Sequence, residues 1–317
     1  MTERTLRIGH LSTVNHTAFI LMGNNSLSEQ GIRAEWELYP SGPDIIRAME
    51  GGKIDLAYIG LPPFIIGIDQ GLQAVCIAGG HIEGTVIIGG PGILPLDTFP
   101  GMGDFLLQFK GKSIGCPPKG SIHDIIVRNL IQRYGIPATV INYAWADFLN
   151  DALDDGEIVA AAGTPALAVA AHRYGNAHII VPPDKLWPSN PSYGLVATRE
   201  LISDEPLLTG FLTAHEEASE LIRHNPLECA RIVAEQTGFV DAEYVLEVYQ
   251  ISPHYCTSLP QEYIDSTEAF AQTLFQLGST KRLISIDEIF DTRFINTVHS
   301  GSHHYRSGID HLPGRSS

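Results

Sequence analysis

Short apolar runs alternate with longer amphipathic segments along the first two thirds of the chain. Apolar runs bounded by Gly, Pro or Asn are typical of buried strands, and the segments between them are typical of helices. In the first part of the chain the predicted strands are 6–9, 34–39, 54–59, 74–78 and 84–89, and the predicted helices are 17–29, 44–51 and 63–71. This alternation predicts βαβ units around a largely parallel sheet.

A second alternating module follows residues 89–103, which are rich in Gly and Pro and which we expect to be a crossing linker. Its predicted strands are 112–116, 139–143, 157–162 and 177–181, and its predicted helices are 121–134, 147–153 and 165–172. After the loop 182–191, a further strand is predicted at 193–198. The sequence from about residue 204 to 277 is almost wholly helical, and a last helix is predicted near 286–296.

Two α/β modules followed by a helical third predict an α/β protein with two lobes around a ligand cleft. The helical third has no sheet of its own to cover, so we expect it to pack on lobe one. The predicted division is 1–90 with 193–299 for lobe one and 91–192 for lobe two. Residues 300–317 are rich in Gly, Ser and His and poor in apolar residues, which predicts a mobile tail.

Polar loops follow the predicted strands, at the edge where open α/β sheets bind ligands beside helix N-termini. Ser41 with Asp44, and Ser121 with Asp124, have the spacing of a capping box. Thr164 stands directly before a proline at the first helical position. Each hydroxyl can serve as a helix cap, as a ligand contact, or as both.

Histidines recur on the same loops, at His10, His16, His81 and His123. Any one of them is more often a surface or supporting residue, and only their grouping points to a site. The aromatic residues Tyr143, Trp145 and Tyr193 are candidates for a binding wall, and Lys119 is the one cation that we find on the predicted cleft loops. The histidines in or beside the tail favour incidental metal affinity over a built site, so no metal site is predicted.

Composition and charge exclude several classes of protein. Twenty Lys and Arg stand against 36 Asp and Glu, which gives a net charge of −16 and argues against nucleic acid or an anionic membrane surface as partner. No apolar run reaches the roughly 18 residues of a membrane helix, so direct membrane insertion is not expected. Neither GxGxxG after a strand nor GxxxxGK[ST], HExxH or GxSxG occurs. The N-terminus lacks a secretory pattern, which predicts a cytoplasmic protein, or an extracytoplasmic one whose signal was removed.

Three stretches carry a resemblance to a known family. Residues 49–67 read MEGGKIDLAYIGLPPFIIG, residues 118–121 read PKGS, and residues 149–161 read LNDALDDGEIVAA. In this order they resemble the motifs of ABC-type nitrate/sulfonate/taurine substrate-binding proteins, a family shared with the thiamine-pyrimidine synthases. The sequence departs from the family at 161–165, AAGTP, where relatives often have an acidic residue and a Trp-x-Pro stretch, so the identity of the ligand is not carried over.

The resemblance implies a type II periplasmic-binding-protein fold, in which two α/β lobes close on a ligand. It implies a small-molecule ligand, an ABC permease and ATPase as partners, and no cofactor. The residues that it assigns to ligand binding are Ser12, Thr13, Ser41, Gly42, Gly60, Leu61, Pro62, Gly80, His81, Gly120, Ser121, Gly163, Thr164 and Tyr193.

Two functions follow as hypotheses. In the first, the protein is a non-catalytic solute-binding protein that clamps a small organic or oxyanionic solute, resembling a sulfonate, nitrate, taurine or thiamine pyrimidine. In the second, it is a cytosolic enzyme on the same fold, of the menaquinone-pathway or thiamine-pyrimidine-synthase type. His10, His81 or His123 would then act as acid or base. The chain has no cysteine cluster like that of the synthases, because its four cysteines are scattered.

Overall fold

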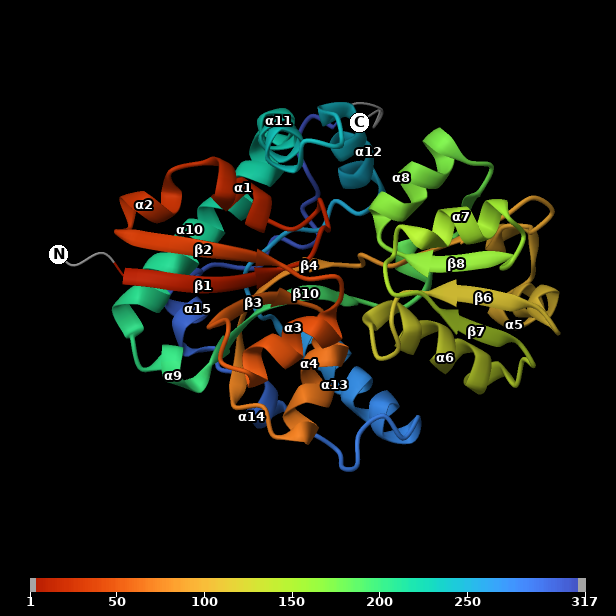
Figure 1. Cartoon of the computed structure of the whole chain (residues 1–317), viewed down its shortest axis with the longest axis horizontal. Coiled ribbons are helices and arrows are strands. Elements are labelled where there is room, and N and C mark those ends of the chain that lie inside the picture. Colours follow the sequence, from red (N-terminus) through yellow and green to blue (C-terminus); the bar gives the residue numbers. More distant parts are fainter. Residues whose placement is uncertain (1–3, 313–317) are drawn as a thin grey trace.

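The computed structural model describes residues 4–312, and its strands form two five-stranded sheets that lie side by side along the long axis (Figure 1). The first sheet has the order β2-β1-β3-β10-β4. Its strands are β1 (Arg4–His10), β2 (Ile32–Leu38), β3 (Leu56–Ile59), β4 (Ala74–Ile82) and β10 (Pro191–Thr198). β1 is parallel to both of its neighbours, whereas β10 runs antiparallel between β3 and β4.

The second sheet has the order β7-β6-β8-β5-β9. Its strands are β5 (Val86–Gly89), β6 (Ser113–Cys116), β7 (Thr139–Asn142), β8 (Ala160–Gly163) and β9 (His178–Val181). β6 is parallel to β7 and β8, and β5 is antiparallel to β8 and β9. The chain enters the second sheet as β5 and returns to the first sheet as β10, and each of these strands is antiparallel to its neighbours.

Helices connect the strands within each lobe. The first lobe contains α1 (Ala18–Gly23), α2 (Ser26–Glu29), α3 (Gly42–Glu50) and α4 (Leu61–Gln70), and the second contains α5 (Met102–Leu106), α6 (Ile122–Tyr134), α7 (Phe148–Asp154) and α8 (Pro165–Tyr174). The predicted helix 17–29 is two helices, because Asn24 adopts an extended backbone that ends α1. Short 3-10 turns lie at Leu96–Thr98, Leu107–Phe109 and Pro183–Lys185.

The chain crosses between the sheets at residues 83–85 and again at 182–190, not at the Gly/Pro-rich segment 89–103. The prediction of a linker at 89–103 was wrong. The strand β5 already pairs with β8 of the second sheet and is fully buried there, so the chain must cross before residue 86. The lobe boundary predicted at residue 90 accordingly falls after β5, whereas the return near residue 193 falls within β10. We propose the two sheets with their helices as the two lobes.

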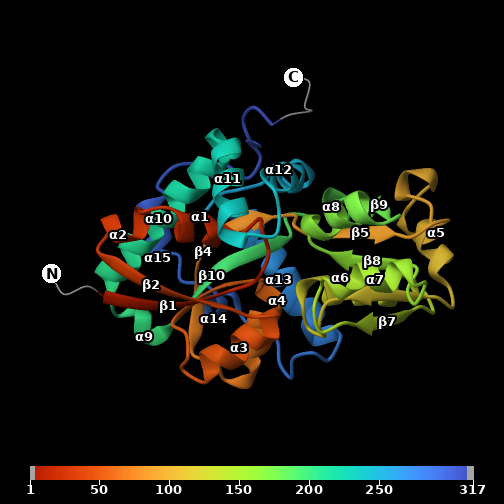
Figure 2. The ribbon, with the colours of Figure 1, turned by 45° about the horizontal axis from the view of Figure 1, so that its top comes forward.

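The helical C-terminal third covers the first lobe, as expected (Figures 1 and 2). It comprises α9 (Arg199–Ile202), α10 (Glu205–His224), α11 (Pro226–Thr237), α12 (Ala242–Ile251), α13 (Gln261–Gln276), α14 (Ile286–Ile289) and α15 (Arg293–Val298). α11 packs on α1, α13 on α4, and α14 and α15 on β4. α12 also reaches α8 in the second lobe.

Residues 300–312 pack against the first lobe, in contrast to the mobile tail that the composition predicts; residues 313–317 of that tail lie outside the described range. Tyr305 is fully buried, and its hydroxyl donates to the Ser258 carbonyl over 3.1 Å. Ile309 and Leu312 are buried as well. A few well-placed apolar side chains fix this segment although its average composition is polar. In the range 4–312 no helix combines the length and apolar character needed to span a membrane.

Candidate functional site

A cavity of about 90 Å³ lies between the two lobes, at the carboxyl ends of the strands. The first lobe contributes the loops after β1, β2 and β3, and the second contributes those after β6, β7 and β8. The lining residues are Leu11, Ser12, Thr13, His16, Pro40, Ser41, Gly42, Gly60, Pro63, Pro117, Ser121, Ile122, His123, Trp145, Ala146, Thr164 and Ser192.

Four helices begin at this cavity, two from each lobe. The residues that precede α3, α4, α6 and α8 are Ser41, Gly60, Ser121 and Thr164, and all four line the cavity. The first turns of a helix have backbone N–H groups without intrahelical partners and carry a partial positive charge. Pro43 in α3, Pro62 and Pro63 in α4 and Pro165 in α8 have no N–H, so the first turn of α6 has the fullest set of donors. The four helix dipoles together still favour a negatively charged or oxygen-rich group.

No Asp, Glu, Lys or Arg is among the residues that line the cavity. Its two histidines are uncharged near neutral pH, because burial lowers the pKa of His123 to about 4 and lowers the pKa of His16 well below the usual value. Nearby His81 and His10 lower the pKa of His16 further. The positive potential at the site thus comes from backbone dipoles and not from cationic side chains.

The capping hydroxyls differ in what they can offer a ligand. The Ser41 hydroxyl donates to the Asp44 carboxylate, so its proton is already used. Ser121 Oγ accepts from the Asp124 backbone N–H over 3.3 Å, which leaves its own proton able to donate. Thr164 makes no side-chain capping bond. Ser121 and Thr164, both in the second lobe, are therefore the hydroxyls best able to bind a ligand.

Asp124 supports this end of the cavity without lining it. Its buried carboxylate accepts from the Gly120 backbone N–H over 2.9 Å, from Arg128 over 2.8 Å and from Asn142 over 2.8 Å. The predicted capping residue is thus structural. Gly120 has a φ of +85°, so its contribution is the left-handed turn before α6, and it does not line the cavity.

Half of the residues predicted to bind a ligand line the cavity, namely Ser12, Thr13, Ser41, Gly42, Gly60, Ser121 and Thr164. Leu61 and Pro62 are buried in the first turn of α4, among the core of the first lobe. Gly163 ends β8, and a Cβ there would overlap Leu167 of α8. Whether the seven lining residues bind a ligand stays a proposal.

Gly80, His81 and Tyr193 lie in the strands behind the cavity. Tyr193 is fully buried, and its hydroxyl lies 3.3 Å from Thr17 Oγ1. His81 lies 2.8 Å from the Ser252 carbonyl through Nε2 and 3.5 Å from Asn15 through Nδ1. Gly80 leaves the space that the Tyr193 ring occupies. These residues form the packed layer that carries the binding loops.

Other candidates also lie away from the cavity. His10 packs edge-on against Phe19 and Trp36, so of the three histidines considered as acid or base only His123 lines the cavity. Lys119 points to an outer depression shared with Arg128 and Leu277. Of the three aromatic residues considered for a wall, only Trp145 lines the cavity.

Several residues that line the cavity were not among those predicted from the sequence to bind a ligand. His16 follows the first predicted strand and was named as a cleft-loop histidine, but it was not assigned to the site. Ile122, Pro117 and Ala146 are apolar residues beside the predicted loops, where no polar signal marks them. Ser192 belongs to β10, and its position at the cavity depends on the pairing of β10 with β4, which lies more than 100 residues earlier in the sequence.

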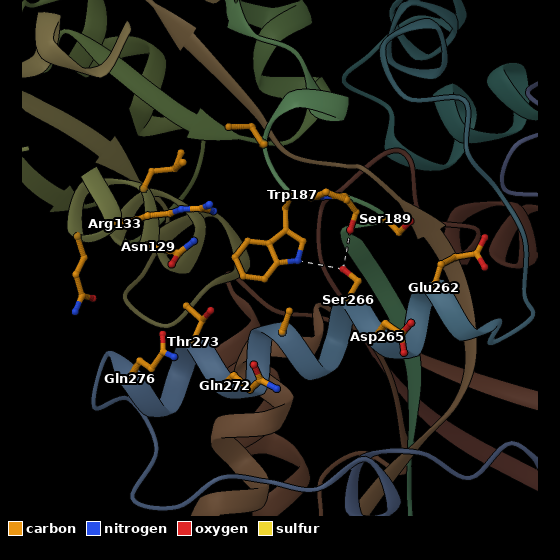
Figure 3. A pocket seen from close by; sticks show the side chains of 15 residues that line it. Asn129, Arg133, Trp187, Ser189, Glu262, Asp265, Ser266, Gln272, Thr273 and Gln276 are labelled. Carbon is orange, nitrogen blue, oxygen red and sulfur yellow. Dashed lines mark hydrogen bonds between the residues drawn. The ribbon is translucent and has the colours of Figure 1, made fainter. Parts of the chain in front are cut away.

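A larger, open groove of about 820 Å³ lies between α6 and α13 (Figure 3). Trp187 points into it, but its ring stacks on Phe270 at 3.9 Å and its Nε1 donates to Ser266 Oγ over 3.1 Å. The groove lies apart from the four helix N-termini, so we assign the candidate site to the smaller cavity. Within residues 4–312 no three His, Cys, Asp or Glu side chains are grouped so as to hold a metal ion.

Solved structures of binding proteins share this architecture. The ligand-binding component of an ABC-type import system from Staphylococcus aureus, with zinc bound, has a TM-score of 0.80 at 15% identity, covering 94% of this chain and 100% of that one. The alkanesulfonate-binding protein SsuA from Xanthomonas axonopodis pv. citri, bound to MOPS, has a TM-score of 0.76 at 17% identity, with 90% and 98% covered. The periplasmic nitrate-binding protein NrtA from Synechocystis has a TM-score of 0.76 at 14% identity, with 93% and 88% covered.

These likenesses confirm the periplasmic-binding-protein-like fold that the sequence resemblance implies. No curated protein matches the sequence. A family described as NMT1-like matches residues 1–238, three quarters of the chain. The chain therefore belongs to the NMT1-like family.

Proposed function

We propose that the protein is the solute-binding component of an ABC-type import system and that it closes its two lobes around a small organic or oxyanionic solute. The observation that carries this proposal is the convergence of four helix N-termini, two from each lobe, on one cavity. Such an arrangement offers donors to a ligand from both sides, so that a bound solute would stabilise the closed form.

The size and polarity of the cavity narrow the solute. A water needs about 10–15 Å³ of such volume, so a cavity of about 90 Å³ holds a group of only a few non-hydrogen atoms. A sulfonate, nitrate or carboxylate group fits this volume and accepts hydrogen bonds on every oxygen. The alkanesulfonate-binding and nitrate-binding proteins of the same fold support this class of ligand for the chain.

An import role further implies a permease and an ATPase as partners. We infer these partners from the similarity to a component of an ABC-type import system. Expression together with candidate permeases in vesicles would test them, through solute uptake that requires both ATP and this protein. Equal uptake without the protein would exclude the role.

The binding proposal is tested by thermal unfolding against a panel of small sulfonates, nitrate, amino acids and pyrimidines. A ligand at one hundred times its Kd adds about 2.7 kcal/mol to the free energy of unfolding, which raises the Tm. Mass spectrometry then identifies the recovered ligand. An unchanged ligand supports the binding role, whereas a chemically changed one would support the enzyme hypothesis with a cavity histidine as acid or base.

A matched pair of variants places the ligand in the cavity. Thr164→Val removes a hydroxyl at the N-terminus of α8, and Thr139→Val makes the same change on the exposed edge strand β7 of the same lobe. We expect Thr164→Val to reduce the ligand-induced rise in Tm and Thr139→Val to leave it unchanged. Equal rises in both variants would exclude the Thr164 hydroxyl from the site.

A further inference from the structure

The His16 side chain lines the cavity and is held by aromatic rings instead of hydrogen bonds. It lies on the loop between β1 and α1, where its backbone N–H donates to the Thr13 carbonyl over 3.0 Å. Its ring lies 4.2 Å from the ring of Tyr193 and 6.1 Å from that of Tyr58, measured between centroids. The residue is 3% exposed, and its Nδ1 has no hydrogen-bond partner among residues 4–312.

Other buried histidines of the first lobe differ in this respect. Both ring nitrogens of His215 have partners, Thr17 Oγ1 at 3.0 Å and the Gly79 carbonyl at 2.9 Å. Both nitrogens of His81 have partners too. Buried polar atoms are nearly always hydrogen-bonded, and an unmade bond on an imidazole destabilises the fold. The unpartnered Nδ1 of His16, in a side chain that lines the cavity, therefore points to a group that occupies the cavity.

The surroundings of His16 decide which kind of group that is. The cavity presents the positive ends of four helix dipoles, the backbone N–H groups of the first turn of α6, and a Ser121 hydroxyl whose proton is free to donate. A ligand that meets these donors must be an acceptor, so His16 meets it best as a donor as well. Because no charged side chain lines the cavity, a second negative charge would be buried without a counter-ion.

We propose that His16 binds the solute directly, its uncharged imidazole donating an N–H to an oxygen of a singly charged oxyanion such as a sulfonate. This inference rests on the proposed function, since it names a contact and a ligand class for the same cavity. The proposed contact predicts that the cavity binds a monoanion more tightly than a dianion such as sulfate. The backbone dipoles and one neutral donor can stabilise a single negative charge but not a second one.

The imidazole is uncharged before the ligand binds, because the protein offers it no carboxylate. The groups that face it from the neighbouring elements and across the cavity are His10 of β1, Tyr58 of β3, His81 of β4, Tyr193 of β10 and His123 of α6. All are neutral near pH 7, and burial lowers the pKa of His16 well below its usual value. The affinity for a monoanion is therefore expected to be independent of pH between 6 and 8.

The test measures methanesulfonate and sulfate binding by calorimetry at pH 6, 7 and 8. The wild-type protein should bind methanesulfonate with the same Kd within twofold at each pH, and more tightly than sulfate. His16→Phe keeps an aromatic ring against Tyr193 but removes the donor, and it should weaken binding at least tenfold, or about 1.4 kcal/mol. His16→Gln restores an N–H donor and should recover part of this loss, and His224→Gln on the surface should change nothing.

Two results would overturn the proposal while leaving the solute-binding role intact. One is a His16→Phe variant that binds methanesulfonate as tightly as wild type, and the other is a wild-type Kd that rises tenfold per pH unit. Failure of the wild-type protein to bind either anion at any pH would instead count against the proposed function itself. As a check independent of folding of the variants, ¹⁵N resonances of His16 in the wild-type protein should show a neutral ring whose N–H shift changes on addition of methanesulfonate; an unchanged shift would exclude the contact.

Discussion

At the scale of single residues, the layer behind the cavity depends on a glycine. Gly80 lies in β4 against the ring of Tyr193, and a Cβ at this position would lie 2.7 Å from Cδ2 of that ring. Backbone and ring are both buried, and the ring packs against His16, so the ring cannot move away without disturbing the loop that carries His16. The glycine is thus required for close approach and not for an unusual backbone conformation.

We predict that Gly80→Ala lowers the free energy of unfolding by about 1–3 kcal/mol, the range typical of overpacking a tight core. Gly301→Ala is the matched control, because a Cβ there meets nothing within 4 Å. Urea denaturation measures both variants. A Gly80→Ala protein as stable as the control would show that Tyr193 has room to shift.

The buried histidines also predict how stability depends on pH. Burial lowers the pKa of His81 to about 3 and lowers those of His123 and His215 to about 4, so the unfolded chain binds more protons than the folded one below pH 6.5. Stability that is complete at pH 7 is therefore lost as the pH falls from 6.5 toward 4. Each such histidine contributes about 1.4 kcal/mol per pH unit in that range.

Urea denaturation at pH 7, 6 and 5 measures this slope. His215→Gln should lower the slope of stability against pH by about the contribution of one histidine. A slope that is the same in wild type and His215→Gln would mean that His215 is protonated in the folded state.

The residues of the site that were predictable from sequence are those whose role is set by their neighbours along the chain. Ser41, Ser121 and Thr164 were recognised because helix caps are local patterns, and each lies at the cavity. His81 and Tyr193 were misplaced because the side of a strand that a residue faces depends on the pairing of β4 with β10. His16 could not be singled out, since its unpartnered nitrogen is a property of the packed structure.

At the scale of elements, the C-terminal segment connects the two crossings between the lobes. Arg306 lies 2.9 Å from Glu83 Oε1 in the first crossing and 2.9 Å from Ser189 Oγ in the second. Glu83 and Ser189 have φ values of +59° and +50°, a region that non-glycine residues rarely adopt. One arginine thus bonds to both of these residues and links the two crossings.

We predict that Arg306→Ala loosens both crossings. Glu83 keeps a bond from the Ser189 N–H and a contact with His254, and Arg306 is half exposed, so the expected loss of stability is about 1 kcal/mol. Hydrogen exchange should speed up at residues 83–85 and 189–190. Arg33→Ala, which removes a weak surface pair with Glu35, is the control. Unchanged exchange at the crossings would refute a role for the segment in holding them.

Element boundaries were largely predictable, whereas their partners were not. The sequence placed the helices α3, α6 and α8 within two residues, because proline, capping residues and glycine mark their ends. It placed the crossing at the Gly/Pro-rich segment instead of at residues 83–85, because β5 can join either sheet until β8 and β9 are present. It missed the packing of the C-terminal segment, since the contacts of Arg306 and Tyr305 lie far away in sequence.

At the scale of the whole molecule, α8 of the second lobe meets α12 of the first, and Figures 1 and 2 both show the two helices side by side. Arg173 near the end of α8 lies 2.7 Å from Glu247 of α12 and 3.1 Å from Asp241 before it. The Tyr244 hydroxyl donates over 2.6 Å to the carbonyl of Ala166, the second residue of α8. These contacts hold together the two lobes whose helix N-termini surround the cavity.

Loss of the Arg173 contacts should therefore shift the protein toward an open form. A partly exposed ion pair contributes up to about 1 kcal/mol, so Arg173→Ala is expected to weaken ligand binding two- to fivefold, because the apparent Kd rises as the closed population falls. The radius of gyration of the ligand-free variant, measured by small-angle scattering, should rise and then return to the wild-type value on ligand saturation. Arg231→Ala, on the exposed face of α11, should change neither quantity. If Arg173→Ala bound as tightly as Arg231→Ala with an unchanged radius, closure would have to depend on the ligand and the two crossings alone, and the α8–α12 contact would serve only the stability of the fold.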